Sequence, residues 1–176
     1  MLERRSALAG IKPVSSAAVT LGEVRDFTLI QAAGFSPEDV LAIASVAGPL
    51  PHRADLATEN HGQIIFRTGP LQFWFVRPVD DDLSARLAGV CVVTPLSHSR
   101  SRIYVEGPAA REVLAKGIAI DLHADAFTPG MFAMTGLHHT PILLHCVQPN
   151  RFELLAMRTF AMNVWEWLED AALEFK

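Results

Sequence analysis

Short apolar runs dominate the hydrophobic pattern of the chain, and most of them have the length and composition of β-strands. They are rich in Val, Ile, Leu and Phe, and clusters of turn-forming residues separate them, which is typical of strands joined by loops. The pattern predicts strands over Val19–Leu21, Phe27–Ala32, Gln63–Arg67, Leu71–Arg77, Val90–Leu96, Arg102–Glu106, Met131–Leu137, Thr140–Val147 and Phe152–Met157. The two strands that flank a Thr-Gly-Pro turn are expected to form a hairpin.

Helix signals interrupt these strands at three internal places. Ser36 is a good N-cap, Pro37 suits the first helical position, and the Gly48-Pro49 pair should end this helix. A short helix is expected after the acidic residues 80–82. Another helix is predicted over Pro108–Lys116, because it has proline at its start and glycine just past its end.

The strongest helix pattern is the last one, over residues 159–173. Its apolar residues fall on one face at helical spacing: Phe160, Val164, Trp167, Leu168 and Ala171. Trp165 and Trp167 lie two positions apart, about 200° around a helix, so they cannot both face the core. We therefore expect one of the two, Trp165, at an interface with a partner, where Trp is enriched.

An internal repeat organises the chain. The segment GFSPEDVLA begins at Gly34 and the segment GPAAREVLA begins at Gly107; each follows a predicted strand and opens a predicted helix. The agreement in element order favours a duplication over a chance match. The sequence thus predicts an α+β fold with mostly antiparallel sheets, formed by one domain over residues 19–176 with pseudo-repeats at about 19–89 and 90–176.

Residues 1–18 are expected to form an N-terminal arm. Ser, Ala, Lys and Pro dominate it after Arg5, and no apolar period is visible. We expect the arm to be mobile in the free chain and to contribute little to the core. In a complex, Arg4 or Arg5 would pair with a carboxylate and Leu2 or Leu8 would fill an apolar pocket. The alternative is a frayed terminus without a role.

Composition places the chain among globular proteins. It has 176 residues, of which 50% are hydrophobic and 19% charged. This length is enough for a substantial core. A small domain with so few charges often covers part of its apolar surface with a partner, and the alternative is simply a large core.

Charge and segment composition exclude several classes of protein. The net charge is −4 and no basic stripe is present, so nucleic acid is not an expected ligand. No apolar stretch is long enough to span a bilayer, and the N-terminus lacks the apolar core of a secretory signal. We expect a cytoplasmic protein with no membrane partner. Cys91 and Cys146 lie in apolar runs and are predicted to be free thiols.

Thr135–Val147 concentrates three of the seven histidines and one of the two cysteines of the chain. On an extended strand His139 and His145 would lie about 20 Å apart, too far to bind one ion. His138 and His139 could sit in a turn beside Pro141, but tetrahedral zinc needs about four ligands and no C-x-x-C pair is present. We predict no metal site, and we interpret His138 and His139 as hydrogen-bonded or partner-interface residues.

His98 lies among serines, in the segment LSHSRSR. No G-x-S-x-G surrounds it and no orienting acid is identifiable, so we predict no catalytic residue here. Arg100 and Arg102 are interpreted as surface or partner contacts. The chain also lacks the G-x-G-x-x-G and G-x-x-x-x-G-K-[ST] motifs, so no cofactor-binding residue is predicted.

These motifs as a set carry a family resemblance. The segments RRSAL, EGPAAREVLAKG, DLHADAFTPG, TGLHHTP and RTFAMNVWEWL resemble the gamma subunit of heterotetrameric sarcosine oxidase. Leu96–Leu122 is also similar to the folate-binding domain of glycine-cleavage aminomethyltransferases. The resemblance implies a duplicated fold of strand-strand-helix-three-strand-helix units whose first strands are exchanged.

The resemblance also implies a noncatalytic subunit. Such an oxidase demethylates sarcosine to glycine and passes the methyl carbon to tetrahydrofolate or releases it as formaldehyde. Its FAD, FMN, NAD and zinc would belong to the other subunits, alpha, beta and delta, as would tetrahydrofolate. Where the transferases carry paired acids, this chain has Thr140-Pro141. Neither residue can act as a general base in the way a carboxylate does.

Three hypotheses for function therefore remain. The first is an assembly subunit of a sarcosine oxidase complex, which holds catalytic partners in register. The second is a stand-alone, folate-binding aminomethyltransferase-like protein of one-carbon metabolism, against which the missing acids count. The third is an interaction protein of one-carbon metabolism with the same fold.

Overall fold

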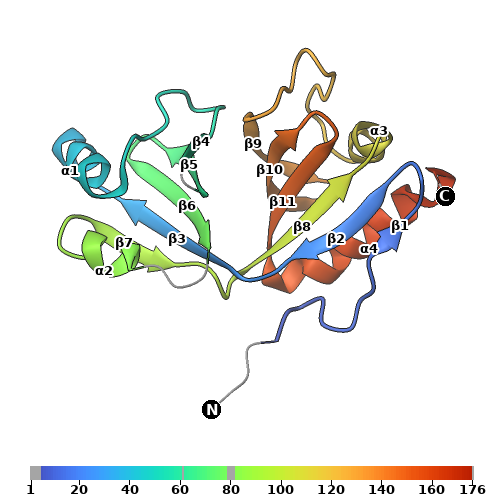
Figure 1. The fold of residues 1–176 in the computed structure, drawn as a ribbon, viewed down its shortest axis with the longest axis horizontal. Helices are drawn as coiled ribbons and strands as arrows, with labels where there is room; N and C mark the ends of the chain where they lie inside the picture. Colours follow the sequence, from blue (N-terminus) through green and yellow to red (C-terminus); the bar gives the residue numbers. More distant parts are fainter. Residues whose placement is uncertain (1–4, 61, 79–81, 176) are drawn as a thin grey trace. The chain divides into compact units, whose positions relative to one another are not determined.

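The computed structural model describes residues 5–60, 62–78 and 82–175. The chain divides into two compact units (Figure 1). Unit 1 combines residues up to 25 with residues from 99 onward, and unit 2 contains residues 26–98. No helix in the described ranges is long and apolar enough to cross a membrane.

Unit 1 is a six-stranded antiparallel sheet with two helices. The sheet has the order β1-β2-β8-β11-β10-β9. Its strands are β1 Val14–Ser15, β2 Thr20–Val24, β8 Arg100–Glu106, β9 Phe132–Leu137, β10 Thr140–Gln148 and β11 Arg151–Met157. The helical elements are α3 Ala110–Ala115, η1 Arg158–Phe160, α4 Ala161–Ala171 and η2 Leu173–Phe175. Alternate strand residues pack with α3 and α4 in one core, as Ile103 and Val105 do with Val164.

Unit 2 is a five-stranded antiparallel sheet with the order β4-β5-β6-β3-β7. Its strands are β3 Phe27–Ala33, β4 Thr58–Asn60, β5 Gln63–Gly69, β6 Gln72–Pro78 and β7 Val92–Pro95, and its helices are α1 Pro37–Ala47 and α2 Leu83–Leu87. Ile43 of α1 and Leu83 and Leu87 of α2 pack with the apolar strand residues in a second core.

The duplication is visible in the topology as an exchange of strands. β2 precedes β3 in sequence but pairs with β8 of unit 1, and β7 precedes β8 but pairs with β3 of unit 2. The sheet of unit 1 therefore contains two strands from the first half of the sequence, β1 and β2, and the sheet of unit 2 contains one strand, β7, from the second half. This arrangement confirms the predicted α+β class with antiparallel sheets and the exchange of first strands that the resemblance implies.

The sequence prediction missed two short strands and misplaced one helix face. β1 lies in the predicted arm, and β4 lies between α1 and β5, where no strand was predicted. In α4 the buried residues are Ala161, Val164, Trp165, Leu168 and Ala171. The predicted stripe was wrong at Phe160, which lies in η1 and is 41% exposed, and at Trp167, which is only partly buried.

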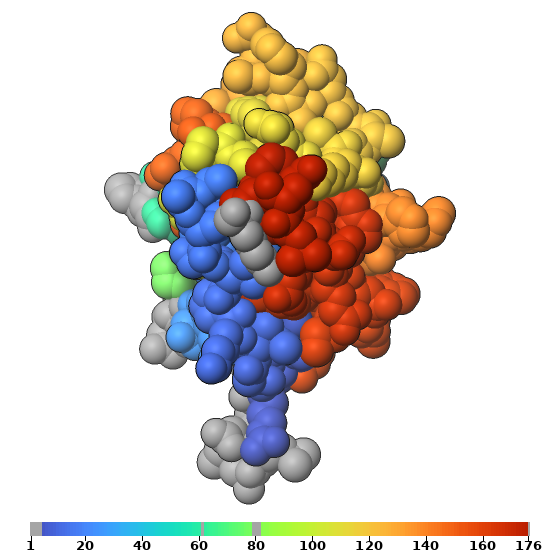
Figure 2. Space-filling model, turned by 90° about the vertical axis from the view of Figure 1, so that its right-hand side faces the viewer, coloured from blue at the N-terminus to red at the C-terminus, as the bar shows by residue number. Residues whose placement is uncertain are grey.

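The predicted arm proves to be part of the unit 1 core. Leu8 is 1% exposed and belongs to the same cluster as the α4 side chains. The Ser16 hydroxyl donates to the carbonyl oxygen of Phe175 at 2.8 Å, and Figure 2 shows the N-terminal segment packed beside the C-terminal helix. The expectation that Leu8 is free to dock on a partner is therefore wrong, because its side chain already fills this core. Leu2 and Arg4 lie outside the described residues.

Replacement of Leu8 by Ala should destabilise the isolated chain. A buried leucine that is truncated to alanine costs about 2–5 kcal/mol, and a site near a terminus can relax, so we expect about 2 kcal/mol. Thermal unfolding of Leu8→Ala should show a clearly lower Tm than the wild type. The matched control is Leu173→Ala, because Leu173 is 53% exposed. Equal melting temperatures for both variants would return residues 5–12 to the role of a mobile arm.

Candidate functional site

The His138-His139 pair forms the two-residue loop of the β9–β10 hairpin. Leu137 pairs with Thr140 across this loop. His138 has φ 53, the left-handed conformation that tight hairpin loops require. Its backbone N–H donates to the carbonyl oxygen of Gly117 at 2.7 Å, so the loop is fastened to the end of α3. The predicted turn is thus confirmed.

A pocket opens where this loop meets α4. Its volume is about 370 Å³, and its lining includes His138, His139, Thr140, Phe160, Asn163 and Trp167. The two imidazole centroids lie 3.9 Å apart. A Cβ atom on Gly117 would lie 2.4 Å from the Trp167 ring, so only glycine lets this indole pack where it does. The pocket thus combines hydrogen-bonding groups of His138, His139, Thr140 and Asn163 with aromatic surface of Phe160 and Trp167.

An exposed apolar side chain lines this pocket, since the Phe160 ring is 41% exposed. An apolar anchor beside convergent polar groups is typical of a site that receives a partner side chain or a small ligand. No group of three or more potential His, Cys, Asp or Glu ligands occurs among the residues that the structure describes.

A row of polar side chains crosses the sheet of unit 1 on the face opposite its helices. Cross-strand pairing places Tyr104, Glu153 and His145 in one row. Glu153 is 6% exposed, and one of its carboxylate oxygens accepts a hydrogen bond from Nε of Arg102 at 2.7 Å and forms an ion pair with Nη2 at 2.5 Å. Its other carboxylate oxygen lies 3.6 Å from Nη2 of Arg151. A buried carboxylate needs such partners, because an unpaired one would be strongly destabilising.

The same row continues outward through Arg151. Its guanidinium lies 4.6 Å from the ring centroid of Tyr104 and is also paired with Glu106. The Tyr104 ring in turn covers Gly22, where a Cβ atom would meet it at 2.4 Å. The charges of this row therefore neutralise one another within unit 1, which is the arrangement of a structural network.

His145 stands beside this network and titrates far from its ordinary range. It is 5% exposed. Burial lowers the pKa of His145 from 6.5 to about 4, and the nearby positive charge of Arg102 acts in the same direction. The imidazole is therefore neutral at pH 7.

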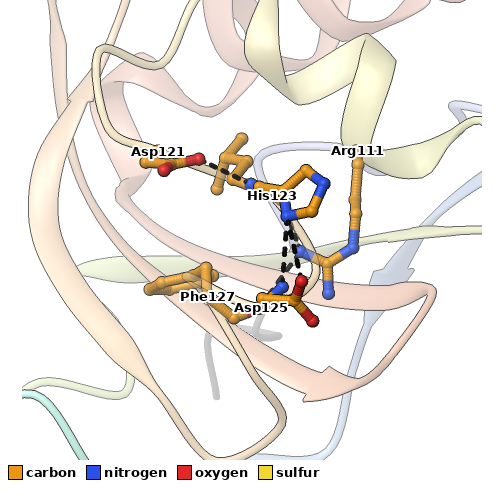
Figure 3. A network of polar contacts seen from close by, with 6 residues as sticks. Arg111, Asp121, His123, Asp125 and Phe127 are labelled. Carbon is orange, nitrogen blue, oxygen red and sulfur yellow. Dashed lines mark hydrogen bonds and ion pairs between the residues drawn. The ribbon is translucent and has the colours of Figure 1, made fainter.

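A third polar cluster lies in the loop between α3 and β9 (Figure 3). Arg111 of α3 donates to the carbonyl oxygens of Leu122 at 2.5 Å and Phe127 at 3.1 Å, and so holds the loop closed. The side chains of His123 and Asp125 are 72% and 94% exposed and lie 3.7 Å apart. This exposed pair belongs to the loop itself and does not form a site with other elements.

The residues that were predicted to contact a partner differ in location and exposure. His138 and His139 share one pocket with Trp167. Arg5 is exposed, and Arg100 is partly buried and donates to the Ser99 carbonyl oxygen at 3.2 Å. His138, His139, Arg5 and Arg100 therefore still place polar groups where a partner could contact them.

Two residues of the predicted interface need correction. The side chain of Arg102 is only 13% exposed, and its charge is engaged by Glu153. Trp165 is 3% exposed and fills the unit 1 core, because α4 begins at Ala161 and turns this indole inward. Both side chains are therefore largely buried and already engaged within the chain. Cys91 and Cys146 are free thiols, as predicted.

Glu153, Arg151, Glu106 and Tyr104 were missed by the sequence analysis. The alternation in RSRIYVE and RFE places the charged residues of each strand on one face. That signal shows which side chains share a face, but only the register of β8 with β11 shows that Arg102 and Glu153 meet.

Comparison with known proteins gives consistent matches. A model of the sarcosine oxidase gamma subunit family matches residues 80–174. The chain is 29% identical over 178 residues to the sarcosine oxidase subunit gamma of Corynebacterium sp. (strain U-96), covering 97% of this chain and 87% of the relative. It is 30% identical over 141 residues to that of Corynebacterium sp. (strain P-1), covering 76% and 70%.

Solved structures extend this likeness to the whole fold. A chain of the heterotetrameric sarcosine oxidase from Corynebacterium sp. U-96, in complex with pyrrole 2-carboxylate, superposes with a TM-score of 0.91 at 28% identity. The match covers 98% of this chain and 96% of that chain. The glycine cleavage system aminomethyltransferase T from Bartonella henselae matches with a TM-score of 0.59 at 19% identity, covering 86% of this chain and 45% of that chain, which shows the fold alone.

The low pKa of His145 predicts a specific loss of stability in acid. Above about pH 6.5 the imidazole is neutral in both the folded and the unfolded state. Between pH 6.5 and 4 only the unfolded chain binds the proton. The free energy of unfolding therefore decreases as the pH falls through this range. The full difference is about 3 kcal/mol. Denaturant unfolding measured at several pH values should show that the free energy of unfolding of His145→Gln falls less steeply than that of the wild type between pH 6.5 and pH 4. His123→Gln is the exposed control and should keep the wild-type dependence; a His145→Gln profile parallel to the wild type would contradict the assignment.

Proposed function

The chain belongs to the sarcosine oxidase gamma subunit family, and from this membership we propose that it is the gamma subunit of a heterotetrameric sarcosine oxidase. The observation that carries the proposal is the match at a TM-score of 0.91 over 98% of the chain to a chain of such an enzyme. The role is assembly: the subunit holds its partners in the arrangement in which sarcosine is demethylated to glycine and the one-carbon unit passes to tetrahydrofolate.

The partners in this proposal are the alpha, beta and delta subunits, and they carry the redox chemistry. FAD, FMN, NAD, zinc and tetrahydrofolate are assigned to them. Two features of the sequence support this division. The chain has no G-x-G-x-x-G dinucleotide motif, and Thr140-Pro141 stands where the aminomethyltransferases carry acids. A cytoplasmic location belongs to the same proposal.

We assign the His138–His139 pocket to contact with a partner subunit. It combines imidazole and amide groups with the exposed Phe160 ring, a mixture that suits a partner side chain with both apolar and polar atoms. Arg5 and Arg100 are offered as further contacts, and Arg4 remains part of the proposal from sequence alone. The buried row around Glu153 is assigned to stability and not to contact.

Co-expression with the genes for flavin-binding subunits tests the proposal directly. A chain that carries an affinity tag should recover those subunits in a constant ratio, together with sarcosine oxidase activity. Expressed alone, the chain should be colourless and should not oxidise sarcosine. A flavin spectrum retained by the isolated chain, or a tagged chain that recovers no partner, would contradict the assembly role.

The same experiment tests the pocket. The variant with His138→Ala and His139→Ala removes both imidazoles and should recover less of the partner subunits while its Tm stays near that of the wild type. His52→Ala is the control, because His52 is an exposed histidine of unit 2 outside the pocket. Unchanged recovery with the double variant would remove the pocket from the interface and leave the assembly role intact.

Tetrahydrofolate binding separates the assembly role from the aminomethyltransferase-like alternative. With Thr140-Pro141 in place of the acids, the isolated chain should bind tetrahydrofolate weakly or not at all. Isothermal titration calorimetry should detect no association in the micromolar range, which corresponds to about −8 kcal/mol. Micromolar affinity for the isolated chain would favour the stand-alone folate protein.

A further inference from the structure

The side chains that line the His138–His139 pocket are rich in hydrogen-bond donors. Five of them carry an N–H or O–H group: His138, His139, Thr140, Asn163 and Trp167. The other described residues of the lining are apolar, so they add no carboxylate, lysine or arginine. Among the described residues of the lining, the two imidazoles are therefore the only groups that can carry a charge, and that charge is positive.

This chemistry selects the kind of group that the pocket accepts. An ionised carboxylate is a pure hydrogen-bond acceptor, which matches a lining of donors, and a protonated imidazole compensates its charge. A lysine or arginine would bring a positive charge beside two imidazoles and would find no acid in this lining. A purely apolar side chain would bury the donors without partners. Because the exposed Phe160 ring lines the same pocket, the best match is an acid that also has apolar atoms.

The donors are held in place by the rest of unit 1. The backbone of His138 is bonded to the end of α3, and Leu137, the residue before the loop, forms a β-bridge with Ile118. Asn163 lies in the first turn of α4, and the next residue, Val164, is 1% exposed and packs in the core. Groups that are fixed in this way lose little conformational entropy when a ligand binds.

The pocket is accessible and large enough for a side chain. His138, His139 and Asn163 are exposed. The volume of about 370 Å³ lies within the range of about 300–1,000 Å³ that is typical of pockets that take a small ligand. One acidic side chain of a partner therefore has room to enter.

The rest of the exposed face of α4 disfavours an acid. Residues 159–175 contain four acidic residues and no lysine or arginine. Glu166 and Asp170 are exposed, and Glu174 is paired with Lys116. A partner carboxylate that approached this face near Glu166 would meet a like charge, which is unfavourable at an interface. The acidic helix therefore restricts a partner acid to the pocket and so helps to fix the register of docking.

We propose that the His138–His139 pocket receives an acidic side chain, Asp or Glu, of a partner subunit. Its carboxylate accepts hydrogen bonds from the imidazoles and from the amide of Asn163, and its aliphatic part packs against the Phe160 ring. The inference rests on the proposed function, because it names the chemistry of a contact through which the subunit assembles.

Asn163→Asp tests the proposal in the tagged full-length chain co-expressed with the flavin-binding subunits. It replaces the amide donors by a carboxylate of nearly the same shape, so recovery of the partners should fall about tenfold or more, because two acids would face each other. Its Tm should not fall, since the helix dipole favours an acid in the first turn. Asn150→Asp is the matched control, because Asn150 is exposed in unit 1 outside the pocket, and it should recover partners normally. The loss with Asn163→Asp should be smaller at high salt.

Two variants of His139 separate charge from shape. They leave His138 in place, because its left-handed backbone belongs to the hairpin loop. His139→Glu should lower recovery about tenfold or more, whereas His139→Lys should keep it within about twofold of the wild type. With His139→Lys, a zero-length carbodiimide should couple the introduced amine to the partner's carboxylate, and mass spectrometry of the linked peptides should identify that Asp or Glu.

The remaining outcomes overturn either the acidic partner residue or the assembly role itself. If the wild type recovers no partner, the assembly role fails. If the wild type recovers its partners and Asn163→Asp recovers them equally well, the acidic residue is wrong and the assembly role stands. Stronger recovery with Asn163→Asp and weaker recovery with His139→Lys would show a basic partner residue instead. If the isolated chain forms a dimer that Asn163→Asp abolishes, the acid comes from a second copy, and the proposed partner is wrong.

Discussion

The pairing of β2 with β8 is the contact on which unit 1 depends. It attaches the N-terminal segment to a sheet whose other long strands follow residue 99. Two glycines make this close approach possible. A Cβ atom on Gly107, which has φ 128, would lie 2.4 Å from the carbonyl oxygen of Ala18, and one on Gly22 would enter the Tyr104 ring. Once β2 is in place, Leu21 is fully buried and the segment that carries Leu8 covers the same core.

The residues of the motif that carries the family resemblance hold parts of unit 1 together. Within EGPAAREVLAKG, Gly107 admits the N-terminal segment and Arg111 closes the loop after α3 through backbone carbonyls. Lys116 donates to the carbonyl oxygen of Ala171 at 2.6 Å, and Gly117 makes room for Trp167. Each of these residues fixes one segment of backbone against another. Such a motif identifies a fold, and the match over the whole chain is what indicates function.

The sequence predicted those features that depend on local order. The duplication, the capped helix at Ser36 and the turn at His138-His139 follow from spacing and turn chemistry alone. Features that need a register were not accessible: the pairing of Arg102 with Glu153 joins residues 51 apart in sequence. The α4 face was missed for a different reason. Stripes through Phe160 and Trp167 or through Ala161 and Trp165 both fit a helical period, and only the 3-10 turn at Arg158–Phe160 selects the second.

The two units solve the same packing problem to different degrees. Unit 1 covers its sheet with a long C-terminal helix and closes its core further with the N-terminal segment, so its repeat helix is buried along one side. Unit 2 has received a strand in exchange, β7, but only a five-residue second helix. In both repeat helices the valine of the shared Val-Leu-Ala segment packs on the core of its unit, since Val113 is fully buried and Val40 packs against the unit 2 core. The following leucine differs between the units, because Leu114 is buried in the unit 1 core whereas Leu41 is 71% exposed, so duplication kept the residue type at this position but not its environment.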